Sequence, residues 1–259
     1  MSPESFDKYV RCCFNREGDD KTDININLVS IYFAKTKDII SKYPRLIKFI
    51  DKDDRLRADK FHFEEDRCTW LFCHTLLRLV IASKLGIDSS EVIFFTDINN
   101  KPWLEGNPLF FNISHTREAL AFAISDSAIV GIDIEKVDRK IDFESIIRTF
   151  FSPGERKFIL TDPDLSREKL FLLWTRKEAL LKALGTGIIN KLTDVEVFRE
   201  INILNSISFE NIVDDHSFCD HYLYSKKILN HYLSLAVPSK AKISFHHLNS
   251  ENVKTILSK

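Results

Sequence analysis

The sequence is poor in glycine, with 7 among its 259 residues, where an average composition would supply roughly 18. Neither G-x-G-x-x-G nor G-x-x-x-x-G-K-[ST] occurs, so the chain lacks the glycine-rich loops that cradle phosphate in many nucleotide-binding proteins. If this protein binds phosphates, its side chains must therefore make most of the contacts.

Other common signatures are also missing. The five cysteines include no C-x-x-C pair, so we expect neither a disulfide framework nor a structural zinc site. No H-E-x-x-H or G-x-S-x-G pattern occurs, which disfavours a zinc enzyme and a serine hydrolase. The first residues are acidic where a signal peptide would be basic, and no apolar run approaches the ~18 residues of a membrane span. We expect a cytoplasmic protein that does not enter a membrane.

Charge of either sign is not in excess. The 37 basic and 38 acidic residues leave a net charge of −1, which disfavours a protein that coats nucleic acid or an anionic membrane. A hydrophobic share of 44% is enough for a sizeable core. The length suits one large domain or two of roughly 100–150 residues.

The order of predicted elements indicates two halves. Residues 1–25 read as loosely ordered, and the charged segment 51–66 as either a solvated surface or a functional segment. Periodicity and turn residues predict helices at 36–50, 64–85, 142–150, from 152 onward and at 166–184, and strands at 24–33, 92–95, 109–113, 119–125, 128–134, 195–198, 231–237 and 242–247. We therefore expect an α+β fold with an N-terminal half at 1–134 and a C-terminal half at 135–259.

Two carboxylates stand on one predicted strand. In Gly131-Ile132-Asp133-Ile134-Glu135, alternation places Asp133 and Glu135 on the same face. Burying both would require a compensating cation, such as Mg²⁺. The alternative is an edge strand whose acidic face meets water.

Two further patterns carry polar chemistry. On the helix at 166–184, Glu178 and Lys182 lie four residues apart on one face, which offers a third carboxylate and a cation, or an ordinary surface pair. At the end of the strand at 109–113, Ser114 and His115 could contact a phosphate, or His115 could be a structural loop histidine.

The ordered set of motifs resembles the 4′-phosphopantetheinyl transferases of the surfactin-synthetase-activating (Sfp) type. The motifs are F-N-I-S-H at 111–115, G-I-D-I-E at 131–135, F-S-P-G-E at 151–155 and W-T-R-K-E-A-L-L-K at 174–182. The resemblance covers roughly residues 55–237. It implies two similar α/β halves in a pseudo-dimer, with the active site at their interface. It also implies transfer of 4′-phosphopantetheine from coenzyme A (CoA) to a serine of an acyl or peptidyl carrier protein, with release of 3′,5′-ADP.

The resemblance assigns roles residue by residue. Asp133, Glu135 and Glu178 would bind Mg²⁺, and Asp133, Glu178 and Lys182 would carry the chemistry. The residues expected to contact CoA are Lys182 and Lys177 at the pyrophosphate, Ser114 and His115 at the phosphate turn, Lys101 and Pro102 at the nucleotide, and Arg57, Lys60 and Arg67 at the 3′-phosphate. Glu178 is also a candidate general base, a role that competes with metal binding.

The sequence departs from the family pattern at three places. Lys60 replaces a common arginine, Arg117 replaces a common glycine, and the residues after about 238 match nothing in the family. Two other functions stay open: a Mg²⁺-dependent nucleotide phosphohydrolase and an inactive module that binds carrier proteins. We expect a monomer, because the chain would supply both sides of the cleft.

Overall fold

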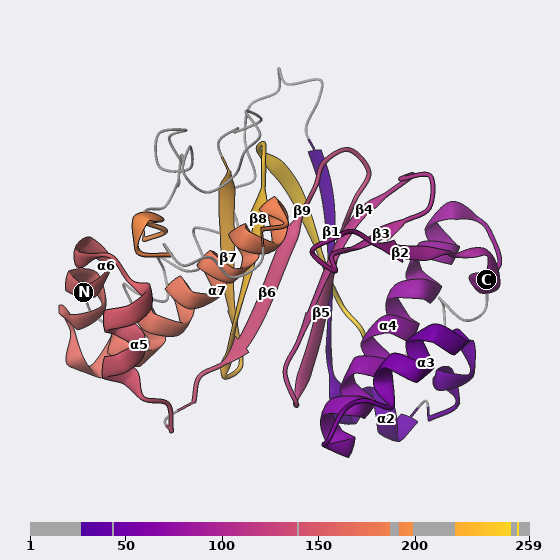
Figure 1. Ribbon diagram of the computed structural model, residues 1–259, viewed down its shortest axis with the longest axis horizontal. Helices are drawn as coiled ribbons and strands as arrows, with labels where there is room; N and C mark the ends of the chain where they lie inside the picture. The colour runs from indigo at the N-terminus through magenta and orange to yellow at the C-terminus, as the bar shows by residue number, and fades with distance from the viewer. Residues whose placement is uncertain are drawn as a thin grey trace.

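The computed structural model describes residues 27–42, 44–138, 140–186, 192–198, 221–249 and 253 (Figure 1). Two β-sheets pack against each other in the middle of the molecule, and helices cover the outer side of each sheet. This arrangement confirms the predicted α+β fold with two α/β halves. The loose order predicted for residues 1–25 lies outside the described residues.

The first half contains a four-stranded sheet in the order β4-β5-β1-β9. Its strands are β1 (Asn27–Lys35), β4 (Phe110–His115), β5 (Ala119–Ser125) and β9 (Ala241–His247), and β2 (Phe94–Thr96) and β3 (Pro102–Leu104) form a small separate hairpin. Its helices are α2 (Thr36–Lys42), α3 (Lys52–Ala58) and α4 (Glu64–Leu85), with short 3₁₀ helices at Pro44–Phe49 and Ser89–Glu91.

The second half contains a three-stranded antiparallel sheet in the order β6-β8-β7. Its strands are β6 (Gly131–Lys136), β7 (Tyr222–Ile228) and β8 (His231–Val237). Its helices are α5 (Phe143–Phe150), α6 (Pro153–Leu160) and α7 (Ser166–Leu184), with 3₁₀ helices at Pro163–Leu165 and Leu192–Asp194. The long helices of the two halves end alike, α4 at Gly86 and α7 at Gly185, each in the left-handed conformation that favours glycine.

Three apolar clusters hold the layers together. One lies between α4 and the first sheet, one between the helices and the sheet of the second half, and one between the two sheets. In β1, Tyr32 belongs to the first cluster, whereas Ile31 and Phe33 belong to the cluster between the sheets. Because alternate side chains of a strand face opposite sides, both faces of β1 are buried.

Helix α7 packs directly on strand β6. A Cβ atom at Gly131 would lie 2.0 Å from the carbonyl oxygen of Ala179 and 2.3 Å from the amide nitrogen of Ala183, so only glycine fits there. Residues two apart on a strand share a face, so Asp133 and Glu135 also face the helix side. The contact at Gly131 therefore sets how closely the carboxylates of β6 approach the side chains of α7.

The strand pairing bears on the predicted boundary between the halves. The boundary between residues 134 and 135 falls inside β6, which pairs with β8 along its length, so we propose that the division lies before Gly131. Strand β9 returns to the first sheet and pairs parallel with β1, with Asn27 opposite Ala241. Strand β9 therefore completes the first sheet.

Three local predictions also change. The predicted helix at 36–50 divides into α2 and a 3₁₀ helix that begins at Pro44, because a proline disfavours helical backbone before it. The charged segment at 51–66 contains helix α3. The predicted strand at 195–198 is wrong, since the Val195 carbonyl accepts a hydrogen bond from the Lys177 ammonium and the Val197 N–H donates to the Glu155 carboxylate.

Helix α4 is the one helix of the described residues that is long and apolar enough to cross a membrane. Of its apolar window, 72% is buried inside the protein. Its side chains, among them Leu76 and Ile81, form much of the first apolar cluster. The hydrophobicity of α4 is therefore accounted for by its place in the core.

We expect Gly131→Ala to destabilise the fold by about 3 kcal/mol, because the new methyl group would overlap backbone atoms of α7. Urea denaturation measures the change. Gly106→Ala is the control: its φ of +73° carries a strain of about 1 kcal/mol, but an added Cβ meets no atom within 4 Å. Equal losses in the two variants would contradict the close packing of α7 on β6.

Candidate functional site

A cavity of about 550 Å³ lies between the two halves. Helices α3 and α4, the β2–β3 hairpin and β4 supply one wall, and α7 supplies the other. This volume falls in the range of small-molecule sites. A second cavity, of about 70 Å³, adjoins the first through Arg57, His74, Thr96 and Pro102, which line both.

Asp133 joins the halves beside the larger cavity, through contacts to Lys182 and Ser114. Its Oδ1 lies 2.7 Å from the Lys182 ammonium of α7 and accepts a hydrogen bond of 2.9 Å from the Ser114 hydroxyl of β4. Asp133 is only 4% exposed, so its side chain does not belong to a strand face open to water. The helix spacing alone also allowed an ordinary surface pair between Glu178 and Lys182. In the structure, Lys182 pairs with Asp133 of β6 instead.

The outer edge of β6 is closed by side chains of the first half. The Ile132 N–H donates to Asn112 Oδ1 at 2.9 Å, and the Ile134 N–H donates to Ser114 Oγ at 3.3 Å. Buried backbone N–H groups need such partners. Ser114 therefore fixes both the strand edge and the Asp133 carboxylate.

Three carboxylates, Asp133, Glu135 and Glu178, interact with the Lys182 ammonium, and of these Glu178 lines the cavity. Burial, followed by the charge of Asp133, raises the pKa of Glu135 to about 7, although Lys182 opposes the shift. Burial and then Asp133 also raise the pKa of Glu178. The local charge is thus more negative than one ammonium neutralises, and a further cation would relieve the repulsion.

The donor atoms present suit a hard cation. Among the described residues, Asp133 Oδ2 and Glu178 Oε1 are buried and lack a hydrogen-bond partner, and carboxylate oxygens are the ligands that Mg²⁺ prefers. No three carboxylate, imidazole or thiolate side chains in the described part of the chain already converge into a metal site. Side-chain rotation would have to bring them together.

His115 lies beside the same group. Burial and then the Lys182 charge lower the pKa of His115, so the imidazole is close to the ammonium. Ser114 and His115 are the last two residues of β4, and Ser114 contacts Asp133. Neither lines the larger cavity, and their contact with a phosphate stays a prediction.

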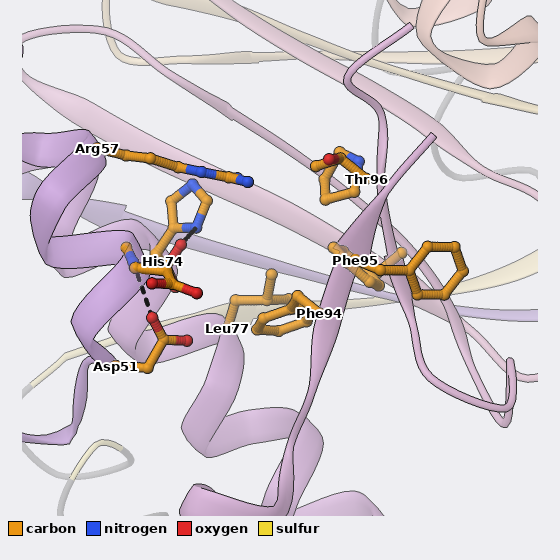
Figure 2. A pocket seen from close by; sticks show the side chains of 11 residues that line it. Asp51, Arg57, His74, Leu77, Phe94, Phe95 and Thr96 are labelled. Carbon is orange, nitrogen blue, oxygen red and sulfur yellow. Dashed lines mark hydrogen bonds and ion pairs between the residues drawn. The ribbon is translucent and has the colours of Figure 1, made fainter. Parts of the chain in front are cut away.

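The wall formed by α3 and α4 combines the Arg57 cation with aromatic rings. Trp70 and His74, one turn apart on α4, stack with their ring centroids 3.8 Å apart. Burial lowers the pKa of His74 to about 3, so its ring is neutral. Figure 2 shows Arg57 reaching from α3 past the His74 imidazole, with Thr96 on the hairpin across the smaller cavity. An anion attached to a planar group would suit this wall.

Lys177 does not reach the cavity. It is fully buried, its ammonium lies 2.8 Å from Glu155 Oε2, and it donates to the Leu192 carbonyl at 2.7 Å. Successive residues on a helix point about 100° apart, so Lys177 leaves the face that carries Glu178. The expectation that Lys177 accompanies Lys182 at a pyrophosphate is therefore wrong.

The other residues predicted to contact CoA fall into two groups: those that line the larger cavity and those that do not. Arg57, Lys101 and Pro102 line the larger cavity. Lys60 is exposed and lies outside the cavity lining. Arg67 also lies outside the lining, and it pairs with Asp59 at 2.9 Å and with Glu64 at 3.2 Å. Of the three cations expected at a 3′-phosphate, the structure brings Arg57 to the site.

The structure adds three residues to the predicted set: Trp70, His74 and Asn112, all of which line the cavity. The helical spacing of Trp70 and His74 is also that of a core-facing stripe, so periodicity alone does not identify them. Asn112 belongs to the F-N-I-S-H motif, so the motif could have identified it from the sequence.

The chain is similar to proteins of known family. It is 33% identical to the 4′-phosphopantetheinyl transferase HetI of Nostoc sp. over 162 residues, which cover 61% of this chain and 68% of that protein. It is 33% identical to the 4′-phosphopantetheinyl transferase Sfp of Bacillus subtilis over 177 residues, which cover 68% of this chain and 76% of that protein. This chain belongs to the 4′-phosphopantetheinyl transferase superfamily.

Further matches agree with this assignment. The transferase psf-1 of Bacillus pumilus is 36% identical over 146 residues, which cover 56% of this chain and 61% of psf-1. A family model of the 4′-phosphopantetheinyl transferase superfamily matches residues 129–236, and one described as 4′-phosphopantetheinyl transferase, N-terminal, matches residues 37–127. The two matches in this transferase meet just before β6, where the strand pairing also divides the halves.

We expect Lys177→Met to lower the free energy of unfolding by about 3–5 kcal/mol, because Glu155 would be left buried without its cation. The double variant Glu155→Gln/Lys177→Met should recover part of this loss. Urea denaturation of the wild type, the two single variants and the double variant gives the coupling. If Lys177→Met had unchanged stability and a raised KM for CoA, Lys177 would instead contact the donor CoA.

We expect Glu135→Gln to stabilise the protein at pH 8 in the presence of a chelator. The folded pKa of about 7 lies above the ordinary value of 4.5, so the penalty on folding grows as the pH rises from 4.5 to 7 and is complete above 7. The gain should be on the order of 1–3 kcal/mol at pH 8 and absent at pH 4. Glu144→Gln, at an exposed position, is the control, and equal stability of wild type and Glu135→Gln at pH 8 would contradict the repulsion.

Proposed function

We propose that this chain transfers 4′-phosphopantetheine from CoA to a serine of an acyl or peptidyl carrier protein and releases 3′,5′-ADP. The observation that carries the proposal is the cluster of Asp133, Glu135, Glu178 and Lys182 beside a cavity that Glu178, Lys182 and Arg57 line. Phosphate groups spaced along one donor molecule would meet Lys182 on one wall and Arg57 on the other. Membership of the superfamily supports the same reaction.

We propose that a Mg²⁺ ion binds at this cluster of carboxylates. Asp133, Glu135 and Glu178 would hold it, since their repulsion and the unpartnered oxygens of Asp133 and Glu178 favour a divalent ion. When bound, such an ion neutralises charge on the donor's pyrophosphate. The residues that bind it come from both β6 and α7, so binding would also hold those two elements together.

The protein's own groups would orient the donor. Lys182 would bind the pyrophosphate, with Ser114 and His115 beside it, and Arg57 would bind the 3′-phosphate. In phosphoryl transfer most of the rate enhancement comes from positioning and charge neutralisation. These side chains suffice for both, which explains how a chain without a glycine-rich loop can bind a pyrophosphate.

The transfer itself exchanges one P–O bond for another. The serine oxygen of the carrier forms a bond to the phosphorus that bears pantetheine, and the bond from that phosphorus to 3′,5′-ADP breaks. The serine proton passes to a carboxylate, for which we propose Glu178, because its Oε1 is unpartnered and burial raises its pKa toward the working range of a base. Ligation of a metal through the same carboxylate would lower that basicity, so the two roles proposed for Glu178 compete with each other.

The cellular setting follows from the same features. We propose that the protein acts in the cytoplasm, where its substrates CoA and carrier proteins would be met, and that it acts as a monomer. Both walls of the cavity come from one chain, so the site needs no second copy. Neither nucleic acid nor a membrane is expected as a partner of a chain with a net charge of −1.

The test is incubation of the protein with CoA, Mg²⁺ and a panel of apo carrier proteins, followed by mass spectrometry of the carriers. We expect a mass gain of one phosphopantetheine on at least one carrier. Asp133→Asn and Glu178→Gln should each lower the rate by roughly 100-fold or more, as loss of a transition-state contact does, whereas Glu144→Gln on the exposed face of α5 should not.

Other outcomes separate the alternatives. Phosphate or nucleotide released from CoA without any carrier would favour the phosphohydrolase. Carrier proteins that bind but gain no mass would favour the inactive binding module. Full activity of Glu178→Gln would refute the role of Glu178.

A further inference from the structure

The loop between β2 and β3 contacts the C-terminal end of α7. The Lys101 ammonium donates to the carbonyl oxygens of Lys182 and Ala183 at 2.7 and 3.0 Å. The Asn99 side-chain amide donates to the carbonyl oxygen of Gly185 at 2.9 Å. The last carbonyls of a helix lack intrahelical donors, so the first half supplies a cap to the helix of the second half.

The capping side chain is itself held in place. Asp97 Oδ1 accepts the N–H groups of Asn99 and Lys101, both at 2.9 Å, and Asp97 Oδ2 accepts the indole N–H of Trp103 at 3.0 Å. Lys101 is only 8% exposed, and its ammonium lies 5.0 Å from the centre of the Trp103 ring. A lysine fixed by its own loop loses little additional freedom when it caps α7.

Lys101 caps the turn of α7 that carries Lys182. The carbonyl that Lys101 binds belongs to Lys182, whose side chain reaches Asp133. Glu178 lies one turn earlier on the same helix. A cation at a helix C-terminus is also favoured by the helix dipole. Two of the three N–H donors of the Lys101 ammonium are used by carbonyls of α7, although the residue lines the cavity.

We propose that Lys101 is a positioning residue of the transfer reaction, which fixes Lys182 and Glu178 by capping α7 and does not bind the phosphates of the donor. This inference rests on the proposed function. It changes the role expected from the sequence, in which Lys101 contacts the nucleotide.

The experiment compares Lys101→Met with the wild-type full chain. We expect kcat to fall roughly 10- to 100-fold, as for a small misplacement of reacting groups, while the dissociation constant of 3′,5′-ADP, measured by calorimetry, changes less than about 3-fold. Lys101→Arg should restore part of kcat, because a guanidinium also donates to two carbonyls. Lys84→Met, an exposed lysine at the end of α4, is the matched control and should change neither quantity.

Three results would overturn the proposal. Weaker binding of 3′,5′-ADP by 10-fold or more with unchanged kcat would mean that Lys101 contacts the donor. An unchanged kcat and unchanged binding would mean that the cap is irrelevant to transfer. A lower thermal midpoint with unchanged kcat would mean that Lys101 is only structural. If Lys101→Met does not fold, Asn99→Ala takes its place, with a smaller fall in kcat expected from the loss of the bond to Gly185.

Hydrogen exchange separates this inference from the proposed function. The Gly185 N–H donates to the Leu181 carbonyl at 2.8 Å, and it should exchange at least 10-fold faster in Lys101→Met than in the wild type. Faster exchange in a protein that modifies no carrier would preserve the cap and refute the function. Unchanged exchange in an active transferase would refute the cap and preserve the function.

Discussion

The site depends on the absence of one side chain between α7 and β6. At Gly131 the helix backbone lies where a Cβ atom would be, and this contact sets the height of the helix above the strand. Lys182 can then reach Asp133 over 2.7 Å, and Glu178 is close enough to raise the pKa of Glu135. A larger separation would leave these charges in separate, solvated environments, so backbone packing and electrostatics are coupled here.

Polar contacts, not only apolar packing, join the halves around the cavity. Asn112 and Ser114 bind the backbone edge of β6, and Lys101 binds the carbonyl end of α7. In each case a side chain of the first half satisfies backbone groups of the second that would otherwise be unpaired. Such contacts are directional, so they fix the relative orientation of the two walls more narrowly than the apolar cluster between the sheets does.

The sequence predicts local features of this fold well. The bounds of α7, the start of α6 after residue 152 and the shared face of Asp133 and Glu135 all follow from rules that act over a few residues. Tertiary placement is less accessible. Lys177 stands next to Glu178 in the chain, but it points into the core and pairs with Glu155. The roles of His74 and Lys101 depend on which half lies opposite, and no local pattern contains that information.

Strand β9 has a consequence for biosynthesis. It pairs with β1 from more than two hundred positions further along the chain, with Asn27 opposite Ala241. A ribosome synthesises the first half early, but that half has an open sheet edge at β1 until β9 emerges. Unpaired edges promote association with other chains, and distant pairings form slowly. The nascent first half is therefore an incomplete domain that depends on a strand synthesised much later, and a protein truncated before β9 would lack the strand that protects that edge.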